Sequence, residues 1–364
     1  MTTSTTSAPE DAEQTVEDTF RAMGSDIHLM IVGGSADLLT VGRDRIEQLE
    51  SRWSRFRPTS EISRLNAAAG QPCVVSADTT LLVEHAVEAW RLTGGGFDPM
   101  QLHAVRAAGY DRSFEKLTAD GDVRPDSSPP PVTSGRFDLS LPGCTDIEFG
   151  NGTITIPAGV GFDPGGIGKG LAADLVAFEL MEAGAAGVCV NMGGDVRVIG
   201  RSPTGSGWTV AIEHPQQSSP IALVGLAEGA VATSSVLRRV WTVGGERRHH
   251  LIDPATGEPS TSDVALATVI ASHAWLAEVL AKAVLLRGTE RAFDLLDDSA
   301  AALIVGHDTT IHTTVGFLNF VGDADVAARL QLDLAGQAEH HAGDLHDDLN
   351  INPGPGPDKG RALS

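Results

Sequence analysis

Two glycine-rich turns carry the residue types that could bind a phosphate group. The first, Asp163–Gly170, has four glycines in eight residues and opens an expected helix. Glycine permits positive φ and a close approach by another molecule, and the N–H groups of a helix N-terminus favour phosphate. The second turn, Asn191–Asp195, follows the apolar strand 187–191. The pair predicts one ligand held between the turns, and the alternative is that the glycines only end the neighbouring elements.

The first turn does not match the common nucleotide-binding loops. Lys169 is followed by Gly170, where a Walker A loop has Ser or Thr, and the Gly-x4-Gly-Lys spacing is missing. The turn also lacks the Gly-x-Gly-x-x-Gly pattern with an acidic residue about twenty positions later. The motifs therefore do not support an ordinary nucleotide-binding fold.

A segment with two histidines could supply a general base. His249 and His250 stand close to Asp253 in the sequence. An imidazole titrates near neutral pH, and a nearby carboxylate can orient it. Such segments also occur as surface loops, so the residues alone leave both interpretations open.

Other charged residues have plain structural interpretations. Asp98 and Asp163 each precede a proline and are of the type that forms turns. Glu278 and Lys282 are four positions apart in an expected helix, where they would form a surface ion pair worth a few tenths of a kcal/mol.

The composition limits the classes of partner. The 364 residues include 48 acidic and 26 basic side chains, for a formal charge of −22. This charge argues against nucleic acid and anionic membrane surfaces, which basic patches bind. An anionic ligand would need local main-chain N–H groups, a metal ion or a few placed cations.

Targeting signals are not apparent in the sequence. No run of about 18 apolar residues predicts a membrane span. The N-terminal residues have neither a basic start followed by an apolar stretch nor a cysteine that could carry a lipid, so we expect a cytoplasmic protein.

The elements that would position these residues are read from apolar periodicity. The chain length allows one large domain or two intimate lobes. Residues 1–17 and the Pro-Gly-rich tail 336–364 are polar, and we expect both to be disordered. The segments with strand or helix spacing are a strand within 20–32, helices at 36–55, 78–93 and 273–287, and strands at 153–156, 208–213, 221–226, 265–271 and 300–305.

Seven segments together resemble the FAD:protein FMN transferase family, the ApbE-type flavin transferases. They are Ala22-Met-Gly-Ser25, Ser60-Glu-Ile-Ser-Arg-Leu-Asn66, Thr93-Gly-Gly-Gly-Phe-Asp-Pro99, the turn Asp163–Gly170, Asn191-Met-Gly-Gly-Asp195, Ala230-Val-Ala-Thr-Ser-Ser235 and His250-Leu-Ile-Asp-Pro-Ala-Thr-Gly257. Each segment is weak by itself, but their order and spacing match the family over roughly residues 20–320.

The resemblance implies an α/β (α+β) fold with mixed sheets and two intimate lobes, formed by residues 18–320. It implies FAD as substrate, bound between the lobes, and a Mg²⁺ ion that helps to break its pyrophosphate. FMN would pass through a phosphoester to a Thr or Ser hydroxyl of an acceptor protein, with release of AMP. The residues that it carries over to the flavin nucleotide site are Met23, Phe56, Gly96, Phe97, Asp98, Gly165, Leu171, Leu251 and Ile252, with His250 as the catalytic base.

One position departs from the family pattern. The resemblance implies metal ligation by the Gly168 carbonyl and by an Asp and a Thr four positions apart, where this chain has Glu278 and Lys282. A carboxylate can bind Mg²⁺, but an ammonium has no lone pair to donate. Lys282 could replace the metal as a cation, or it could pair with Glu278. The chain could then also be an FAD-binding protein without catalysis, or an FAD pyrophosphatase.

Overall fold

A computed structural model gives the fold. It describes residues 14–119, 122–123, 143–214, 216–323 and 326–327. The expected disordered segments therefore lie largely outside the described residues: 336–364 wholly, and 1–17 except for its last four residues. Those four correct one boundary, because the first strand, β1, already begins at Thr15.

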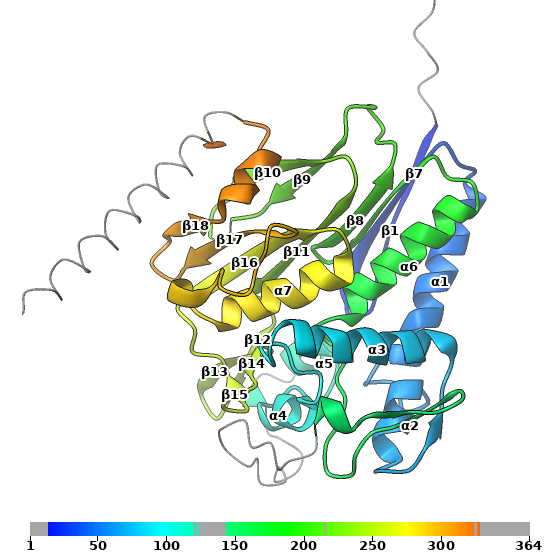
Figure 1. Cartoon of the computed structure of the whole chain (residues 1–364), viewed down its shortest axis with the longest axis vertical. Coiled ribbons are helices and arrows are strands. Elements are labelled where there is room, and N and C mark those ends of the chain that lie inside the picture. The colour runs from blue at the N-terminus through cyan, green and yellow to red at the C-terminus, as the bar shows by residue number, and fades with distance from the viewer. Residues whose placement is uncertain (1–13, 120–121, 124–142, 215, 324–325, 328–364) are drawn as a thin grey trace, which may run out of the picture.

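One eight-stranded sheet forms the larger part of the molecule (Figure 1). Its order is β1-β2-β7-β8-β11-β16-β17-β18, and every neighbouring pair is antiparallel. The strands are β1 Thr15–Ala22, β2 Ser25–Val32, β7 Gly187–Met192, β8 Asp195–Gly200, β11 Gly229–Ser235, β16 Val264–Ala271, β17 Ala301–Gly306 and β18 Ile311–Thr313. All residues of β16 are buried, which explains its uninterrupted apolar sequence.

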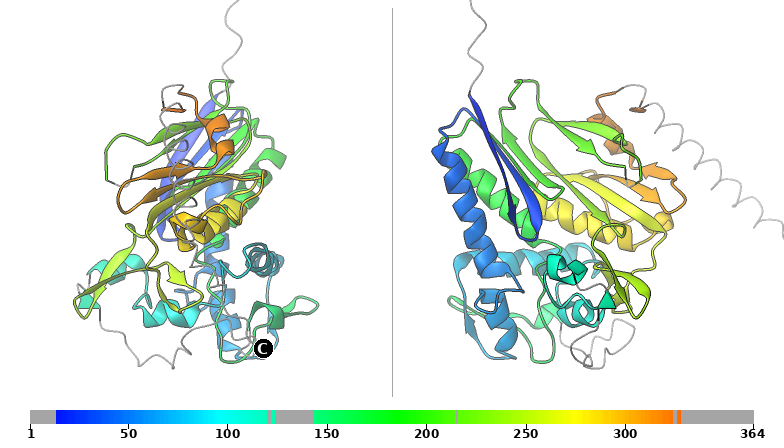
Figure 2. Two further views of the ribbon diagram at one scale, coloured as in Figure 1. Left: turned by 60° about the vertical axis from the view of Figure 1, so that its left-hand side comes forward. Right: turned by 180° about the vertical axis from the view of Figure 1, so that it is seen from behind.

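Three helices cover one face of this sheet (Figure 2). They are α1 Asp37–Trp53, α6 Gly168–Glu182 and α7 Ala274–Leu286. Alternate strand residues face this layer, as Ile27, Leu29 and Ile31 do in β2. α6 and α7 lie side by side. Their N-termini are so close that a Cβ on Gly170 would overlap the main chain of Ala274.

The other face of the sheet is covered by a hairpin and a short helix. Strands β9 Trp208–Ile212 and β10 Ala222–Leu226 pair with each other, and the 3-10 helix η3 spans Val315–Phe320. Trp208 and Phe317 are buried there against sheet residues such as Leu303. The sheet is thus the middle layer of three.

A second part of the molecule lies beneath the helix layer (Figure 1). Its helices are α2 Glu61–Ala67, α3 Ala77–Leu92, α4 Leu102–Ala107 and α5 Phe114–Ala119, with 3-10 helices η1 Cys144–Asp146 and, beside α7, η2 Thr289–Arg291. Three small sheets join them: β3 Cys73–Val74 with β6 Thr153–Thr155 and β5 Glu148–Phe149; β13 Glu246–His249 with β12 Val240–Val243 and β4 Asp122–Val123; and β14 Ile252–Asp253 with β15 Glu258–Pro259. The expected α/β architecture with several sheets is confirmed.

The two parts are tied by a half-buried cluster of ion pairs. Arg45 of α1 donates to Asp78 of α3 at 2.7 Å and to Glu179 of α6 at 2.9 Å.

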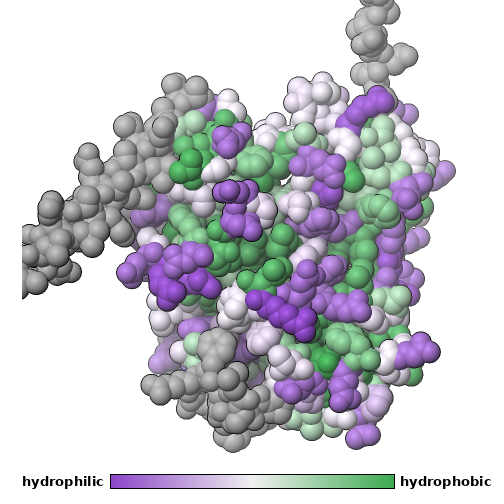
Figure 3. Space-filling model, in the orientation of Figure 1, coloured by the Kyte–Doolittle hydropathy of each residue, from purple (hydrophilic) through white to green (hydrophobic). Residues whose placement is uncertain are grey.

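On the face in Figure 3, polar and apolar side chains alternate in small groups. In the described part of the chain, no helix has the length and apolar character needed to cross a membrane.

Candidate active site

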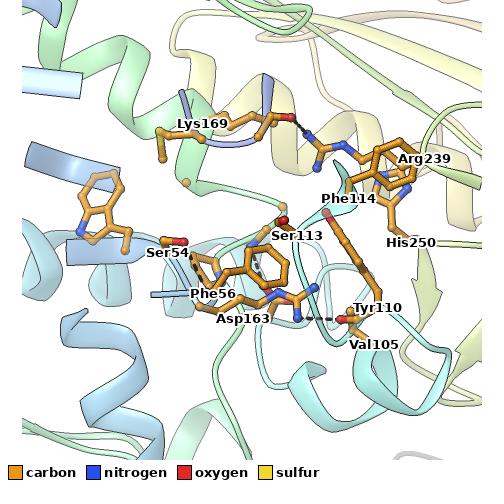
Figure 4. Close-up of a pocket in the computed structure, with 18 of the residues that line it drawn as sticks. Ser54, Phe56, Val105, Tyr110, Ser113, Phe114, Asp163, Lys169, Arg239 and His250 are labelled. Atoms are coloured by element: carbon orange, nitrogen blue, oxygen red, sulfur yellow. Dashed lines mark hydrogen bonds and ion pairs between the residues drawn. The ribbon is translucent and has the colours of Figure 1, made fainter. Parts of the chain in front are cut away.

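A cavity of about 520 Å³ lies between the helix layer and the second part of the molecule. A smaller cavity of about 80 Å³ adjoins it. The residues shared by both linings are Gly165, Gly166, Lys169, Arg239, His250 and Lys282. In Figure 4, Lys169 and Arg239 lie on one side of the large cavity and Phe56, Tyr110 and Asp163 on the other.

Local hydrogen bonds hold the glycine turn at the floor of the cavity. Asn66 brackets the main chain of Phe162, accepting its N–H at 2.7 Å and donating to its carbonyl at 2.9 Å. The Asp163 carboxylate accepts from the N–H of Gly165 at 2.9 Å and pairs with Arg55 at 3.5 Å. Asp163 thus forms the turn that its sequence context predicts, and α6 starts immediately beyond it at Gly168.

One wall of the cavity includes the glycine turn at the end of α3. The Thr93 hydroxyl donates to the Ala89 carbonyl at 2.8 Å and accepts from the N–H of Phe97 at 2.9 Å, which closes the turn around Gly96. Asp98 accepts from the main-chain N–H of Met100 at 2.8 Å. Its carboxylate therefore organises the turn while the residue also lines the large cavity.

Aromatic rings form part of the cavity wall, with the rings of Phe56 and Tyr110 tilted by 51° to each other. The ring centroids of Phe56 and Tyr110 are 5.6 Å apart, and those of Tyr110 and Trp241 are 5.3 Å apart. The Arg55 guanidinium lies 4.2 Å from the Phe56 ring centroid and 4.5 Å from that of Tyr110. Such a surface suits a planar ring system, because stacked rings attract through dispersion and offset packing.

A buried charge network lies behind the turn. The Lys169 ammonium contacts the Asp195 carboxylate and lies 2.8 Å from Oε1 of Glu278. Oε2 of Glu278 accepts from the main-chain N–H of Gly170 at 2.8 Å. Burial raises the pKa of Asp195 to about 6 despite the opposing charge of Lys169. The sequence-based expectation of a surface Glu278–Lys282 pair was wrong, because Glu278 is 5% exposed and pairs with Lys169.

The residues expected to hold Mg²⁺ do not fit a metal ion in this arrangement. Mg²⁺ requires near-octahedral oxygen ligands, but the Lys169 ammonium already lies between the two nearby carboxylates, in contact with Asp195 and 2.8 Å from Oε1 of Glu278. Gly168 is the first residue of α6. Lys282 places an ammonium, which has no lone pair for a metal ion, where the family pattern has a hydroxyl. Within the described ranges, no three His, Cys, Asp or Glu side chains gather as metal ligands.

His250 lies where the two cavities adjoin. Its Nδ1 atom is buried and has no hydrogen-bond partner in the described part of the chain. Burial, followed by the charges of Arg239 and Lys282, holds the pKa of the imidazole well below its usual 6.5. The ring is therefore neutral at pH 7, and a neutral imidazole has a nitrogen that can accept a proton.

The neighbours of His250 have structural roles. Nε2 of His249 lies 3.1 Å from the Ser260 carbonyl, and its Nδ1 accepts from the N–H of Leu251 at 3.3 Å. The Asp253 carboxylate accepts from the N–H of Ala255 at 2.9 Å. Among the described residues, Asp253 forms no hydrogen bond with either histidine, so the hypothesis of a carboxylate-oriented histidine is not supported by the geometry.

The structure brings most of the sequence-predicted site residues together. Those lining the large cavity are Met23, Phe56, Gly96, Phe97, Asp98, Gly165, Gly168, His250 and Ile252. Leu251 and Glu278 line only the smaller cavity. Leu171 is one turn into α6, 2% exposed and packed in the core instead of along either cavity.

Sequence analysis missed Arg239, Tyr110 and Phe114, which also line the large cavity. Arg239 adopts φ +50°, and its guanidinium donates to the Ser25 hydroxyl at 3.0 Å. It thereby ties the loop after β11 to the β1–β2 turn, where Met23 also has φ +50°. Non-glycine residues with positive φ gather at functional sites, but the sequence gives no signal for them.

The fold and this cavity define an α/β protein suited to a ligand that carries both a planar ring and phosphate. The chain belongs to the ApbE family, whose family model matches residues 23–304. The FAD:protein FMN transferase of Vibrio cholerae is 27% identical over 286 residues, which cover 77% of this chain and 80% of that protein. The FAD:protein FMN transferase of Treponema pallidum is 28% identical over 292 residues, covering 76% and 79%.

Solved structures agree with this membership. The ApbE protein of Thermotoga maritima superposes with a TM-score of 0.73 at 25% identity, covering 85% of this chain and 100% of that one. The flavin transferase ApbE of Vibrio cholerae gives a TM-score of 0.70 at 25% identity with the same coverage.

Proposed function

We propose that this protein transfers FMN from FAD, through a phosphoester, to a Thr or Ser hydroxyl of an acceptor protein and releases AMP. The observation that carries the proposal is the neutral imidazole of His250, whose Nδ1 has no hydrogen-bond partner among the described residues. It lies beside the glycine turn and the side chains of Lys169, Arg239 and Lys282, in a cavity lined by segments that resemble the family. The relatives named FAD:protein FMN transferase support the same reaction.

The chemistry follows from these groups. The acceptor hydroxyl oxygen attacks the FMN phosphorus, and the bond from that phosphorus to the bridging oxygen breaks. AMP leaves with the bridging oxygen, and His250 takes the hydroxyl proton. Phosphoryl transfer depends mainly on positioning and on neutralising the phosphate oxygens. The N–H groups and small glycines of the turn at 163–170 supply the positioning.

The isoalloxazine ring and the diphosphate of FAD would occupy different parts of the large cavity. The isoalloxazine ring packs against the aromatic wall formed by Phe56 and Tyr110, with Met23 and Ile252 at its margins. The diphosphate lies over Gly165, beside the turn of Gly96, Phe97 and Asp98. Leu251 reaches the substrate from the smaller cavity, whereas Leu171 supports the turn from the core.

The assay mixes purified protein, FAD and a peptide carrying a flavinylation site. We expect a covalently fluorescent peptide and AMP. The His250→Gln variant should lose about 100-fold or more in rate, the usual contribution of a general base, while FAD binding persists. His307→Gln changes an exposed histidine that lines neither cavity; it is the matched control and should keep the wild-type rate.

The same assay separates the alternatives. An FAD pyrophosphatase would release FMN and AMP without the peptide. An FAD-binding protein without catalysis would hold FAD and release no AMP. Absence of measurable FAD binding would reject all three functions. The expected cytoplasmic location stays a prediction, which cell fractionation tests.

A further inference from the structure

The ammonium group of Lys282 lies where the two cavities adjoin, directly over the glycine turn. The side chain lines both cavities. A Cβ on Gly166 would overlap Nζ of Lys282, so the ammonium rests against the α-carbon of this glycine. Nζ also lies 5.6 Å from the ring centroid of Phe97, within the range of a cation–π contact. The cation is therefore held in a defined place.

The neighbouring cations are engaged by protein groups, and Lys282 is not. Lys169 is paired with two carboxylates, and Arg239 donates to the β1–β2 turn. Among the described residues, Lys282 has neither a hydrogen bond nor an ion pair. Glu278, one helical turn away, already accepts from Lys169 and Gly170.

This arrangement leaves the Lys282 ammonium without a carboxylate in direct contact among the described residues. Withdrawing an ammonium from water is unfavourable unless an anion compensates it, and burial lowers the pKa of Lys282 although the carboxylates of Glu278, Asp163 and Asp195 oppose this shift. A phosphate group over Gly166 would provide the compensation. An ammonium binds phosphate as a point charge with three N–H donors.

We propose that the Lys282 ammonium binds the FAD diphosphate directly, and that FMN transfer in this protein therefore proceeds without a divalent metal ion. This inference rests on the proposed function, because it names the cation that neutralises the diphosphate during transfer. Lys282 would touch the substrate at the place where the family pattern has a metal-ligand hydroxyl. The hydrogen bonds that Glu278 already accepts from Lys169 and Gly170 support the same conclusion.

The first test measures binding in the presence of chelator. FAD and riboflavin, which has no phosphate, are titrated into wild type, Lys282→Met and Lys282→Arg. Loss of the ammonium should weaken FAD binding by about 10-fold to 100-fold, the usual effect of a charged hydrogen bond, and change riboflavin binding less than about twofold. Lys282→Arg should retain most of the FAD affinity. Arg291→Met removes an exposed charge outside both cavities and is the matched control.

The second test uses the unaltered protein, so that it does not depend on the folding of any variant. Transfer to the acceptor peptide is measured after chelation and again after Mg²⁺ is added. We expect equal rates. A wild-type rate that is lost with chelator and restored by Mg²⁺ would overturn the inference while leaving the proposed function intact.

The remaining outcomes are also decisive. If Lys282→Met weakens FAD and riboflavin equally, or neither, the ammonium does not contact the diphosphate and the inference is wrong. If wild type binds FAD but transfers nothing under either condition, the proposed function fails, and the FAD-to-riboflavin comparison still decides whether Lys282 binds the diphosphate.

Discussion

Replacing Glu278 by Ala should reveal how much the buried charge network stabilises the fold. The substitution removes the acceptor of the Gly170 N–H and one of the two carboxylates around Lys169. An orphaned buried N–H costs about 1–3 kcal/mol, and breaking a buried ion pair costs about 3–5 kcal/mol. Because Lys169 keeps its contact with Asp195, we expect a total loss of about 4 kcal/mol in the free energy of unfolding.

Glu278→Gln should cost less, about 1–3 kcal/mol, because its amide oxygen can still accept from the Gly170 N–H. Urea unfolding followed by circular dichroism measures both values. The exposed Glu290→Ala is the control, with a change within about 0.5 kcal/mol expected. If Glu278→Ala also unfolds within about 0.5 kcal/mol of wild type, the network does not hold α6 against α7 and the reasoning is refuted.

Three further predictions concern the site and its frame. Gly166→Ala should displace Lys282, because the new Cβ overlaps its Nζ; titration should show at least about tenfold weaker FAD binding. Burial holds the pKa of His250 well below its usual 6.5 in the folded state, so the unfolded chain binds the extra proton, and as the pH falls below 6.5 wild type should lose more unfolding free energy than His250→Gln, as denaturation at a series of pH values would show. Asp174→Ala removes the carboxylate that accepts from the first two N–H groups of α7 and that pairs with the buried Arg197, and denaturation should show a loss of about 3–5 kcal/mol.

Apolar periodicity predicted the elements that frame the site. The expected helix at 273–287 is α7, and the expected strand at 265–271 is β16, because both are apolar enough to be buried on more than one side. The turn at 163–170 stands before a helix as predicted, and it lines the cavity. Local sequence was sufficient for these features because each depends on neighbours within one element.

Contacts between residues far apart in the chain could not be predicted from the sequence. Glu278 and Lys282 stand four apart, which favours a surface pair, but the packing of α6 against α7 brings Lys169 to Glu278 from 109 positions away. Leu171 follows the glycine turn directly, yet its position in the helix directs it into the core. Arg239 and Tyr110 reach the cavity only through tertiary packing, so no local pattern marks them.

The most direct test of the whole account is the product balance of wild-type protein with FAD and acceptor peptide in the presence of chelator. Chromatography and mass spectrometry quantify AMP and the FMN-bearing peptide. The account predicts equal amounts of both, with no requirement for added metal. AMP with free FMN but no modified peptide would contradict transfer, and products that form only after Mg²⁺ is added would contradict the role of Lys282.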